Sequence, residues 1–204
     1  MHSFTAHAGV LSLTFLLAAC GGNEPSAGTS SSNATAQTMA INAEIAKQLP
    51  LDDQQDFADA TRGLIASQKP LQVKNADGKV LWDMEKYAFI DGAAPDSVNP
   101  SLWRQAKLNN IHGLFEVTPG IYQLRGFDLA NITLIQGKTG WILVDPLTTA
   151  PTARNALAFA REQLGDQKIS AIIFTHSHID HFGGIDGVLS DSEREQLQVI
   201  APEG

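Results

Sequence analysis

The chain has 204 residues, a formal net charge of −8 at pH 7, 43% hydrophobic residues and 18% charged residues. This composition is typical of a globular protein and excludes a largely disordered or membrane-embedded one. Because nucleic-acid phosphates are bound mainly by Lys and Arg, the acidic balance argues against DNA or RNA as a partner. It leaves anionic small molecules open, since a bound divalent metal would dominate the local field.

The chain begins with a pattern typical of export. Residues 10–19 form a short apolar run, and the single cysteine, Cys20, follows it. Such a run is too short to cross a bilayer as a helix but fits a signal peptide, which we expect over residues 1–19. Leu17-Ala18-Ala19-Cys20 resembles the lipobox of bacterial lipoproteins, in which the cysteine is acylated. We therefore expect an exported protein, periplasmic or anchored to a membrane through Cys20; a plain signal peptide with an incidental cysteine is the alternative.

The next segment is rich in Ser, Thr, Ala and Gly, and we expect residues 20–50 to be a flexible tether. Residues 51–113 read as a helical and extended segment. Within it, residues 52–67 have acids near the start and apolar residues near helical spacing, which predicts an amphipathic helix. Asn75-Ala76-Asp77-Gly78 predicts a turn between two extended pieces in residues 71–82.

Asn99 and Pro100 predict the start of another helix, over residues 100–112, with Gly113 beyond its end. His112 lies near the end of this helix, and we interpret it as a helix-end or core-facing residue rather than a metal ligand.

From residue 114 to residue 204 the pattern is that of an α/β domain. Four short β-type runs separated by Thr118-Pro119-Gly120 and Gly137-Lys138-Thr139-Gly140 predict an antiparallel meander. An amphipathic helix follows over residues 149–164, ended by Gly165, and then an apolar strand over residues 169–175. Two short helical pieces and a last strand are predicted after it. The four runs are residues 115–117, 121–124, 132–136 and 141–144; the later pieces are residues 184–189, 192–197 and 198–201.

Four metal-ligand side chains follow the apolar strand at once: His176, His178, Asp180 and His181. Imidazole nitrogen and carboxylate oxygen are zinc ligands. Because alternate residues of an extended segment share a side, His176 and His178 can reach one ion, while Asp180 and His181 face a second. We expect Phe182-Gly183-Gly184 to let the backbone turn close to the ions. An exposed polar loop that binds no metal is the alternative.

Asp145 ends the strand before this α/β unit, in Leu143-Val144-Asp145-Pro146. We interpret its carboxylate as a second-shell group that organises the metal loop. A plain turn role, in which the carboxylate only bonds neighbouring amides, is the alternative.

The segment Thr175-His176-Ser177-His178-Ile179-Asp180-His181-Phe182-Gly183-Gly184 resembles the zinc signature of the metallo-β-lactamase superfamily, and the strand ending in Asp145-Pro146 resembles the strand before it. Further segments are similar to the alkylsulfatases of that superfamily, which hydrolyse dodecyl sulfate. These are Asn99-Pro100-Ser101-Leu102-Trp103-Arg104-Gln105, Gly113-Leu114-Phe115-Glu116-Val117, Gly126-Phe127-Asp128-Leu129-Ala130-Asn131-Ile132, and Trp82-Asp83 with Tyr87-Ala88-Phe89-Ile90-Asp91-Gly92.

The resemblance implies an α/β fold, the layered αββα sandwich of the superfamily, incomplete here and preceded by a helical segment. It also implies a homodimeric hydrolase that cleaves sulfate from alkyl chains with two zinc ions, one held by His176 and His178, the other by Asp180 and His181. Asp180 is expected to act in catalysis by orienting the attacking hydroxide. The family's remaining ligands have no counterpart in these 204 residues. We therefore expect the chain by itself to be inactive or nearly so.

Two other functions stay open. Another hydrolase of the same superfamily would act on a lactone, a thioester or a β-lactam, because one fold hosts many reactions. A non-catalytic, metal-binding surface lipoprotein is the third possibility.

Overall fold

The computed structural model describes residues 34–194 and 197–203. The predicted signal peptide, the lipid-attachment site Cys20 and the first part of the tether lie outside the described residues. Residues 34–204 form one compact unit. No helix in the described part of the chain has both the length and the apolar character that a bilayer crossing needs.

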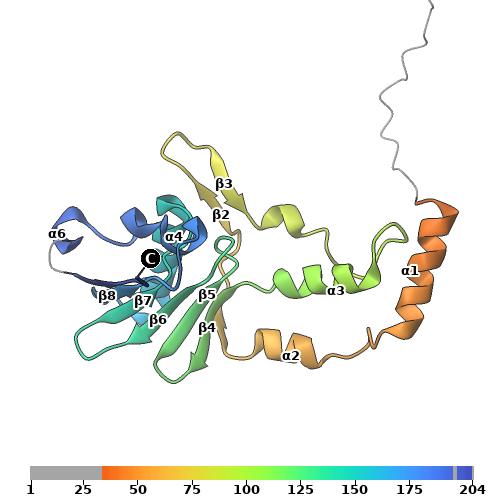
Figure 1. Ribbon diagram of the computed structural model, residues 1–204, viewed down its shortest axis with the longest axis horizontal. Coiled ribbons are helices and arrows are strands. Elements are labelled where there is room, and N and C mark those ends of the chain that lie inside the picture. The colour runs from red at the N-terminus through yellow and green to blue at the C-terminus, as the bar shows by residue number, and fades with distance from the viewer. Residues whose placement is uncertain (1–33, 195–196, 204) are drawn as a thin grey trace, which may run out of the picture. The chain divides into compact units, whose positions relative to one another are not determined.

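This unit contains both helices and strands (Figure 1). In order, they are α1 (Ala36–Gln48), α2 (Gln55–Thr61), β1 (Leu64–Ala66), β2 (Gln72–Lys74), β3 (Val80–Asp83), the 3-10 helix η1 (Glu85–Tyr87), α3 (Pro100–Asn109), β4 (Gly113–Thr118), β5 (Ile121–Arg125), β6 (Ile132–Gln136), β7 (Trp141–Val144), α4 (Ala150–Leu164), β8 (Ile169–Ile173), α5 (Ile179–Phe182), the 3-10 helix η2 (Ile185–Gly187), α6 (Asp191–Arg194) and β9 (Gln198–Ile200).

Helix α1 occupies a segment for which the sequence predicted a flexible tether reaching residue 50. The Thr35 hydroxyl caps the helix by accepting a hydrogen bond of 3.1 Å from the Thr38 amide. Most residues of α1 are Ala, Gln, Met, Glu or Lys, which favour a helical backbone. The Ser and Gly residues that indicated a tether lie before this helix, so the prediction extended the tether too far.

The helix predicted over residues 52–67 is wrong in its second half, because α2 is followed by strand β1. Gly63 lies between them with a φ of +75°, a conformation that turns the chain out of the helix and that glycine adopts without strain. Its carbonyl accepts a hydrogen bond of 2.8 Å from the Glu116 amide of β4. Leu64 and Ile65, which fit a helical face in the sequence, therefore form part of an edge strand.

The predicted turn and the second predicted helix are confirmed. Strands β2 and β3 form a hairpin, in whose turn the Asn75 side chain accepts from the amides of Asp77 and Lys79. Helix α3 begins where the Asn99 side chain accepts from the Ser101 amide over 2.9 Å. It ends at Asn109, three residues earlier than predicted.

Seven strands form one sheet in the order β1-β4-β5-β6-β7-β8-β9. The predicted antiparallel meander is confirmed over β4, β5, β6 and β7. Strand β8 then pairs in parallel with β7, and β9 pairs in parallel with β8. Because β1 comes from the segment before residue 114, that segment and the α/β unit share one sheet.

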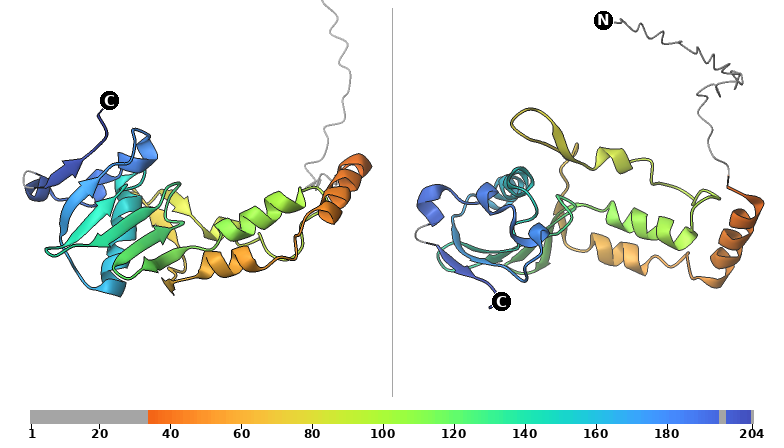
Figure 2. Two further views of the ribbon diagram at one scale, coloured as in Figure 1. Left: turned by 60° about the horizontal axis from the view of Figure 1, so that its bottom comes forward. Right: turned by 45° about the horizontal axis from the view of Figure 1, so that its top comes forward.

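Helix α4 connects β7 to β8 and packs against one face of this sheet (Figure 2). Alternate residues of the central strands, such as Leu124, Leu134 and Leu143, point to this face and are fully buried. They meet the small residues Ala153 and Ala156 of α4, which let the helix approach the sheet closely. The β2–β3 hairpin also contacts α4 and extends the same core.

The opposite face of the sheet is only partly buried, at Gln123, Thr133, Ile142 and Ile173 for example. In an αββα sandwich a second sheet covers this face. The only strands that the structure describes outside the large sheet are β2 and β3, and these contact α4. The described residues thus form one helix layer and one sheet of the expected α/β fold.

A pair of Leu→Ala substitutions tests where the core lies. Leu124 is fully buried in β5, whereas Leu102 of α3 is 65% exposed. We expect Leu124→Ala to lower the free energy of unfolding by about 2–5 kcal/mol, because it leaves a cavity. Leu102→Ala, the matched control, is expected to change it by less than about 0.5 kcal/mol. Urea unfolding followed by circular dichroism measures both, and equal losses would contradict this assignment of the core.

Candidate metal centre

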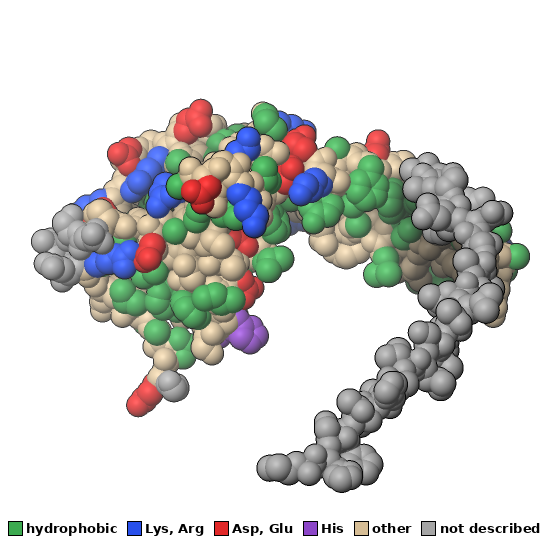
Figure 3. Space-filling view, turned by 90° about the horizontal axis from the view of Figure 1, so that it is seen from above, with side chains coloured by type: hydrophobic (Ala, Val, Ile, Leu, Met, Phe, Trp, Pro, Cys, Tyr) green, Lys and Arg blue, Asp and Glu red, His purple; other side chains and the backbone are tan. Residues whose placement is uncertain are grey.

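Two of the four predicted ligand residues, His176 and His178, lie on the loop between β8 and α5, and the other two, Asp180 and His181, lie in the single turn of α5. This loop follows the C-terminal end of a parallel strand, where open α/β sheets place their chemistry. His176 and His178 are exposed, while Asp180 and His181 are partly buried. Figure 3 shows histidine side chains, in purple, at the molecular surface.

The structure brings the three imidazole rings of this loop together. The ring centroid of His176 lies 4.6 Å from that of His178 and 4.1 Å from that of His181. His181 Nε2 is 3.4 Å from Asp180 Oδ2. All four predicted side chains therefore belong to one cluster, with His176 between the other two histidines.

Asp145 is the buried group on which this cluster rests. It is only 7% exposed and ends β7 with a φ of +57°, an uncommon conformation for a non-glycine residue. Its Oδ1 accepts from the Thr175 amide over 2.9 Å, and its Oδ2 accepts from the Thr175 hydroxyl over 2.7 Å. Oδ2 also lies 2.8 Å from His181 Nδ1. The carboxylate thus joins the end of β7 to both ends of the histidine loop.

These contacts determine where the imidazole protons lie. A carboxylate only accepts, so His181 Nδ1 carries a proton and donates it to Asp145. The Thr175 hydroxyl gives its one proton to Asp145, so it accepts from His176 Nδ1, which is 2.9 Å away. In the neutral form, both rings therefore present an Nε2 lone pair, which is what a metal ion binds.

The donor set suits zinc in type and, for one pair, in spacing. Two ligands held about 2.1 Å from a tetrahedral zinc ion are about 3.4 Å apart, and His181 Nε2 and Asp180 Oδ2 have this separation. Both atoms are acceptors, so a cation or a proton belongs between them. Elsewhere the fit is incomplete: among the described residues, no three His, Cys, Asp or Glu side chains are arranged to hold one ion.

The glycines after the loop lie close to the backbone of another segment. Gly183 and Gly184 have ordinary negative φ values. A Cβ at Gly184 would overlap the carbonyl oxygen of Pro146, and one at Gly183 would overlap that of Thr148. The Gly184 amide donates to the Leu147 carbonyl over 2.8 Å. The glycines thus let the metal loop pack against the connection between β7 and α4.

Sequence reasoning missed the residues that support this connection. The Thr175 hydroxyl donates to the Asp145 carboxylate and accepts from His176, so it connects the two side chains. Asp128, in the β5–β6 loop, accepts hydrogen bonds from the hydroxyls of Thr148 and Thr152. Only the placement of Thr175 directly before the first histidine could have indicated its role.

His112 makes contacts typical of a structural residue, as predicted. Its Nδ1 lies 2.9 Å from the Asn110 carbonyl and its Nε2 lies 3.2 Å from the Gln68 carbonyl. Both ring nitrogens therefore lie within hydrogen-bonding distance of backbone carbonyls, just after the end of α3.

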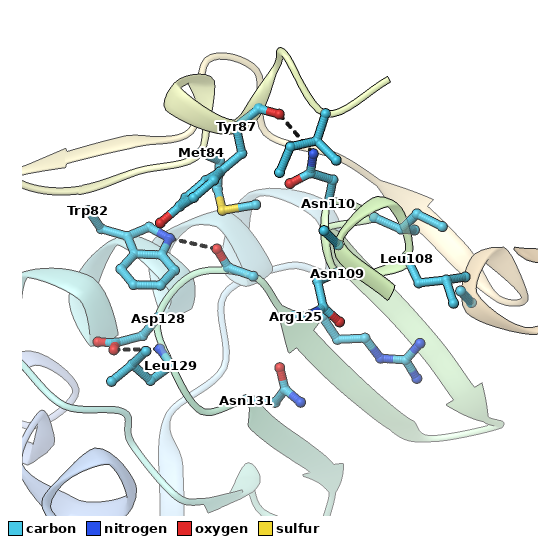
Figure 4. A pocket seen from close by; sticks show the side chains of 15 residues that line it. Trp82, Met84, Tyr87, Leu108, Asn109, Asn110, Arg125, Asp128, Leu129 and Asn131 are labelled. Atoms are coloured by element: carbon cyan, nitrogen blue, oxygen red, sulfur yellow. Dashed lines mark hydrogen bonds between the residues drawn. The ribbon is translucent and has the colours of Figure 1, made fainter. Parts of the chain in front are cut away.

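A separate hollow of about 570 Å³ lies between η1, α3 and the β5–β6 loop (Figure 4). Trp82, Met84 and Leu129 give it apolar walls, and burial lowers the pKa of Arg125 at its side. None of the four predicted metal ligands lines it. This hollow is thus distinct from the histidine cluster.

Asp145→Asn tests whether the carboxylate holds the loop. Asn tolerates a positive φ, so the substitution keeps the backbone, removes the charge and replaces one of the two acceptor oxygens by an NH2 donor. We expect the free energy of unfolding to fall by about 1–3 kcal/mol. We also expect the ring ¹⁵N chemical shifts of His176 and His181 to show that the Nδ1–H tautomer is no longer the main one. Asp91→Asn, at an exposed position, is the control and should change neither. Unchanged ring signals in Asp145→Asn would contradict the assignment.

Known proteins are similar to this chain in sequence. The sequence model of the metallo-beta-lactamase superfamily matches residues 125–192, which include the histidine loop. An (R)-specific secondary-alkylsulfatase from Pseudomonas sp. is 51% identical over 84% of this chain, and an alkyl/aryl-sulfatase from Saccharomyces cerevisiae is 44% identical over 82% of it. The chain spans about a quarter of the length of these relatives, 26% of each.

A solved structure shows the same fold. It is that of a stereoselective inverting sec-alkylsulfatase from Pseudomonas sp., with a TM-score of 0.79 and 51% identity, covering 84% of this chain and 27% of that one. The fold, the histidine loop and these relatives together show that the chain belongs to the metallo-β-lactamase superfamily, on its alkylsulfatase branch.

Proposed function

We propose that this chain carries the first metal-binding loop of a zinc-dependent hydrolase that cleaves sulfate esters of alkyl chains. The observation that carries the proposal is the pair formed by His181 Nε2 and Asp180 Oδ2, 3.4 Å apart. The imidazole of this pair is held by a buried carboxylate, so two acceptors face each other in a way that a bound cation would satisfy.

His176, His178, Asp180 and His181 are the residues that would hold the metal. Zinc in such a site supplies a Lewis acid that counters the charge developing on the sulfate ester as it is cleaved. The relatives named above act on alkyl or aryl sulfates by their descriptions. A third relative, a linear primary-alkylsulfatase from Pseudomonas sp., is 45% identical over 84% of the chain. These relatives support the substrate class and leave primary and secondary esters to be distinguished by assay.

The chain's own residues have distinct roles in this proposal. Asp145 and Thr175 keep the Nδ1 protons of His181 and His176 in place, so each ring presents its Nε2. One carboxylate oxygen of Asp180 would hold the ion. The other can accept a hydrogen bond from the attacking water and orient it toward the ester.

Zinc affinity tests the ligand assignment. We expect His178→Ala to weaken zinc binding by at least tenfold, because one imidazole ligand is lost, whereas His112→Ala should leave it within twofold. Competition with a chromophoric chelator measures both affinities. Acidification should release the metal from the unmodified chain, because histidine must be neutral to bind. Equal affinity in the two variants would contradict the proposal.

A substrate panel tests the reaction. The protein expressed from its complete gene is assayed for sulfate release from a primary and a secondary alkyl sulfate, and for turnover of a lactone, a thioester and a β-lactam. We expect turnover of an alkyl sulfate only, and its loss in Asp180→Ala. Turnover of another substrate with no sulfate release would favour a different hydrolase of the superfamily.

A further inference from the structure

Asp128, in the loop between β5 and β6, is a buried carboxylate that the proposed chemistry does not use. It is 7% exposed. None of the ion pairs among the described residues includes it, so neutral donors compensate its burial. One of these is the Leu129 amide, at 2.6 Å (Figure 4). A carboxylate buried with such a set of donors is costly to leave unpaired, which indicates a specific role.

The remaining donors come from the connection between β7 and α4. The Thr148 hydroxyl donates to Asp128 over 2.7 Å and the Thr148 amide over 3.3 Å. The Thr152 hydroxyl, in the first turn of α4, donates over 2.5 Å. Asp128 therefore fixes one end of residues 145–149, while Asp145 fixes the other end through Thr175 and His181.

The backbone between these two anchors is strained. Asp145 and Leu147 have φ values of +57° and +67°, a conformation that is unfavourable for residues other than glycine. Strained conformations of this kind persist only where the surroundings impose them. Leu147 is fully buried, and the two carboxylates provide restraints on either side of it.

The strained connection is also the surface on which the metal loop rests. The Leu147 carbonyl accepts from the Gly184 amide, and the carbonyls of Pro146 and Thr148 lie where side chains on Gly184 and Gly183 would stand. Gly183 directly follows α5, which contains Asp180 and His181. A shift of Thr148 would therefore move the turn that ends α5.

We propose that Asp128 is a positioning residue for the metal loop: by holding Thr148 and Thr152, it sets the place of Asp180 and His181. The inference rests on the proposed function only in treating these two residues as metal ligands. The contacts that connect Asp128 to α5 through Thr148 do not depend on a bound metal. Asp128 touches neither the ligands nor a reacting atom and acts through the connection between β7 and α4.

The test uses the full 204-residue chain with two readouts. The first is metal-free: the ¹⁵N shifts of the His181 ring, which report its tautomer. The second is affinity for Co²⁺, followed by its visible absorption. Asp128→Asn keeps the shape of the side chain but places an NH2 group, a donor, where a carboxylate oxygen accepted from a threonine hydroxyl. We therefore expect a mixture of the two tautomers of His181 and an affinity for Co²⁺ about tenfold lower.

A matched pair keeps the test decisive if Asp128→Asn fails to fold. Thr148→Val removes only the hydroxyl that bonds Asp128, and Thr148→Ser retains it. We expect Thr148→Val to reproduce both changes and Thr148→Ser to restore the unmodified values. Asp166→Asn, at an exposed side chain, is the charge control.

The outcomes separate the inference from the proposed function. Folded Asp128→Asn and Thr148→Val chains that keep the tautomer and the affinity would overturn the inference, even if they melt at lower temperature, because their effect would be on stability alone. An unmodified chain that binds no Co²⁺ would overturn the proposed function. In that case, the tautomer of the two variants still decides whether Asp128 positions His181.

Discussion

A single buried carboxylate, that of Asp145, sets the arrangement on which the candidate site depends. It receives two hydrogen bonds from Thr175 and one from His181, and through the Thr175 hydroxyl it also fixes the proton of His176. Because the protons lie on Nδ1, the Nε2 atoms of two rings are free to bind a cation. Without this carboxylate, the loop after β8 would be an exposed polar segment, and the rings of His176 and His181 would have no preferred tautomer.

The fold supplies the rigid frame that such an arrangement needs. Strands β7 and β8 are parallel neighbours, so the end of one, with Asp145, lies beside the end of the other, with Thr175. Helix α4 covers the face of the sheet to which the buried residues of these strands point. Thr152 in its first turn and Thr148 just before it donate hydrogen bonds to Asp128. The sheet and helix α4 thus hold the two carboxylates that support the site, and the segment after β8 carries the predicted ligands.

Much of this could be predicted from the sequence, because local signals and tertiary structure agree. Short β-type runs separated by turn residues indicated the meander, Asn99 and Thr149 marked helix starts, and the density of ligand residues after an apolar strand indicated the site. The prediction over residues 52–67 was wrong because Leu64 and Ile65 suit a helix locally, while pairing with β4 and the positive φ of Gly63 favour a strand.

The support of the site was harder to predict. Asp128 precedes apolar residues in a loop, and its partners Thr148 and Thr152 lie 20 and 24 positions further along the chain. No periodic pattern links residues brought together by the sheet order. The contacts of Gly183 and Gly184 were hard to predict for the same reason, since the carbonyls they meet belong to the connection between β7 and α4, far away in sequence.

X-ray absorption at the zinc edge tests the central claim most directly. The chain is purified without chelators, loaded with zinc and washed. The account predicts stoichiometric zinc with nitrogen and oxygen ligands at about 2.0–2.1 Å and the outer-shell scattering of imidazole rings, reduced in His181→Ala. Zinc that is absent, or bound with water ligands alone, would contradict it.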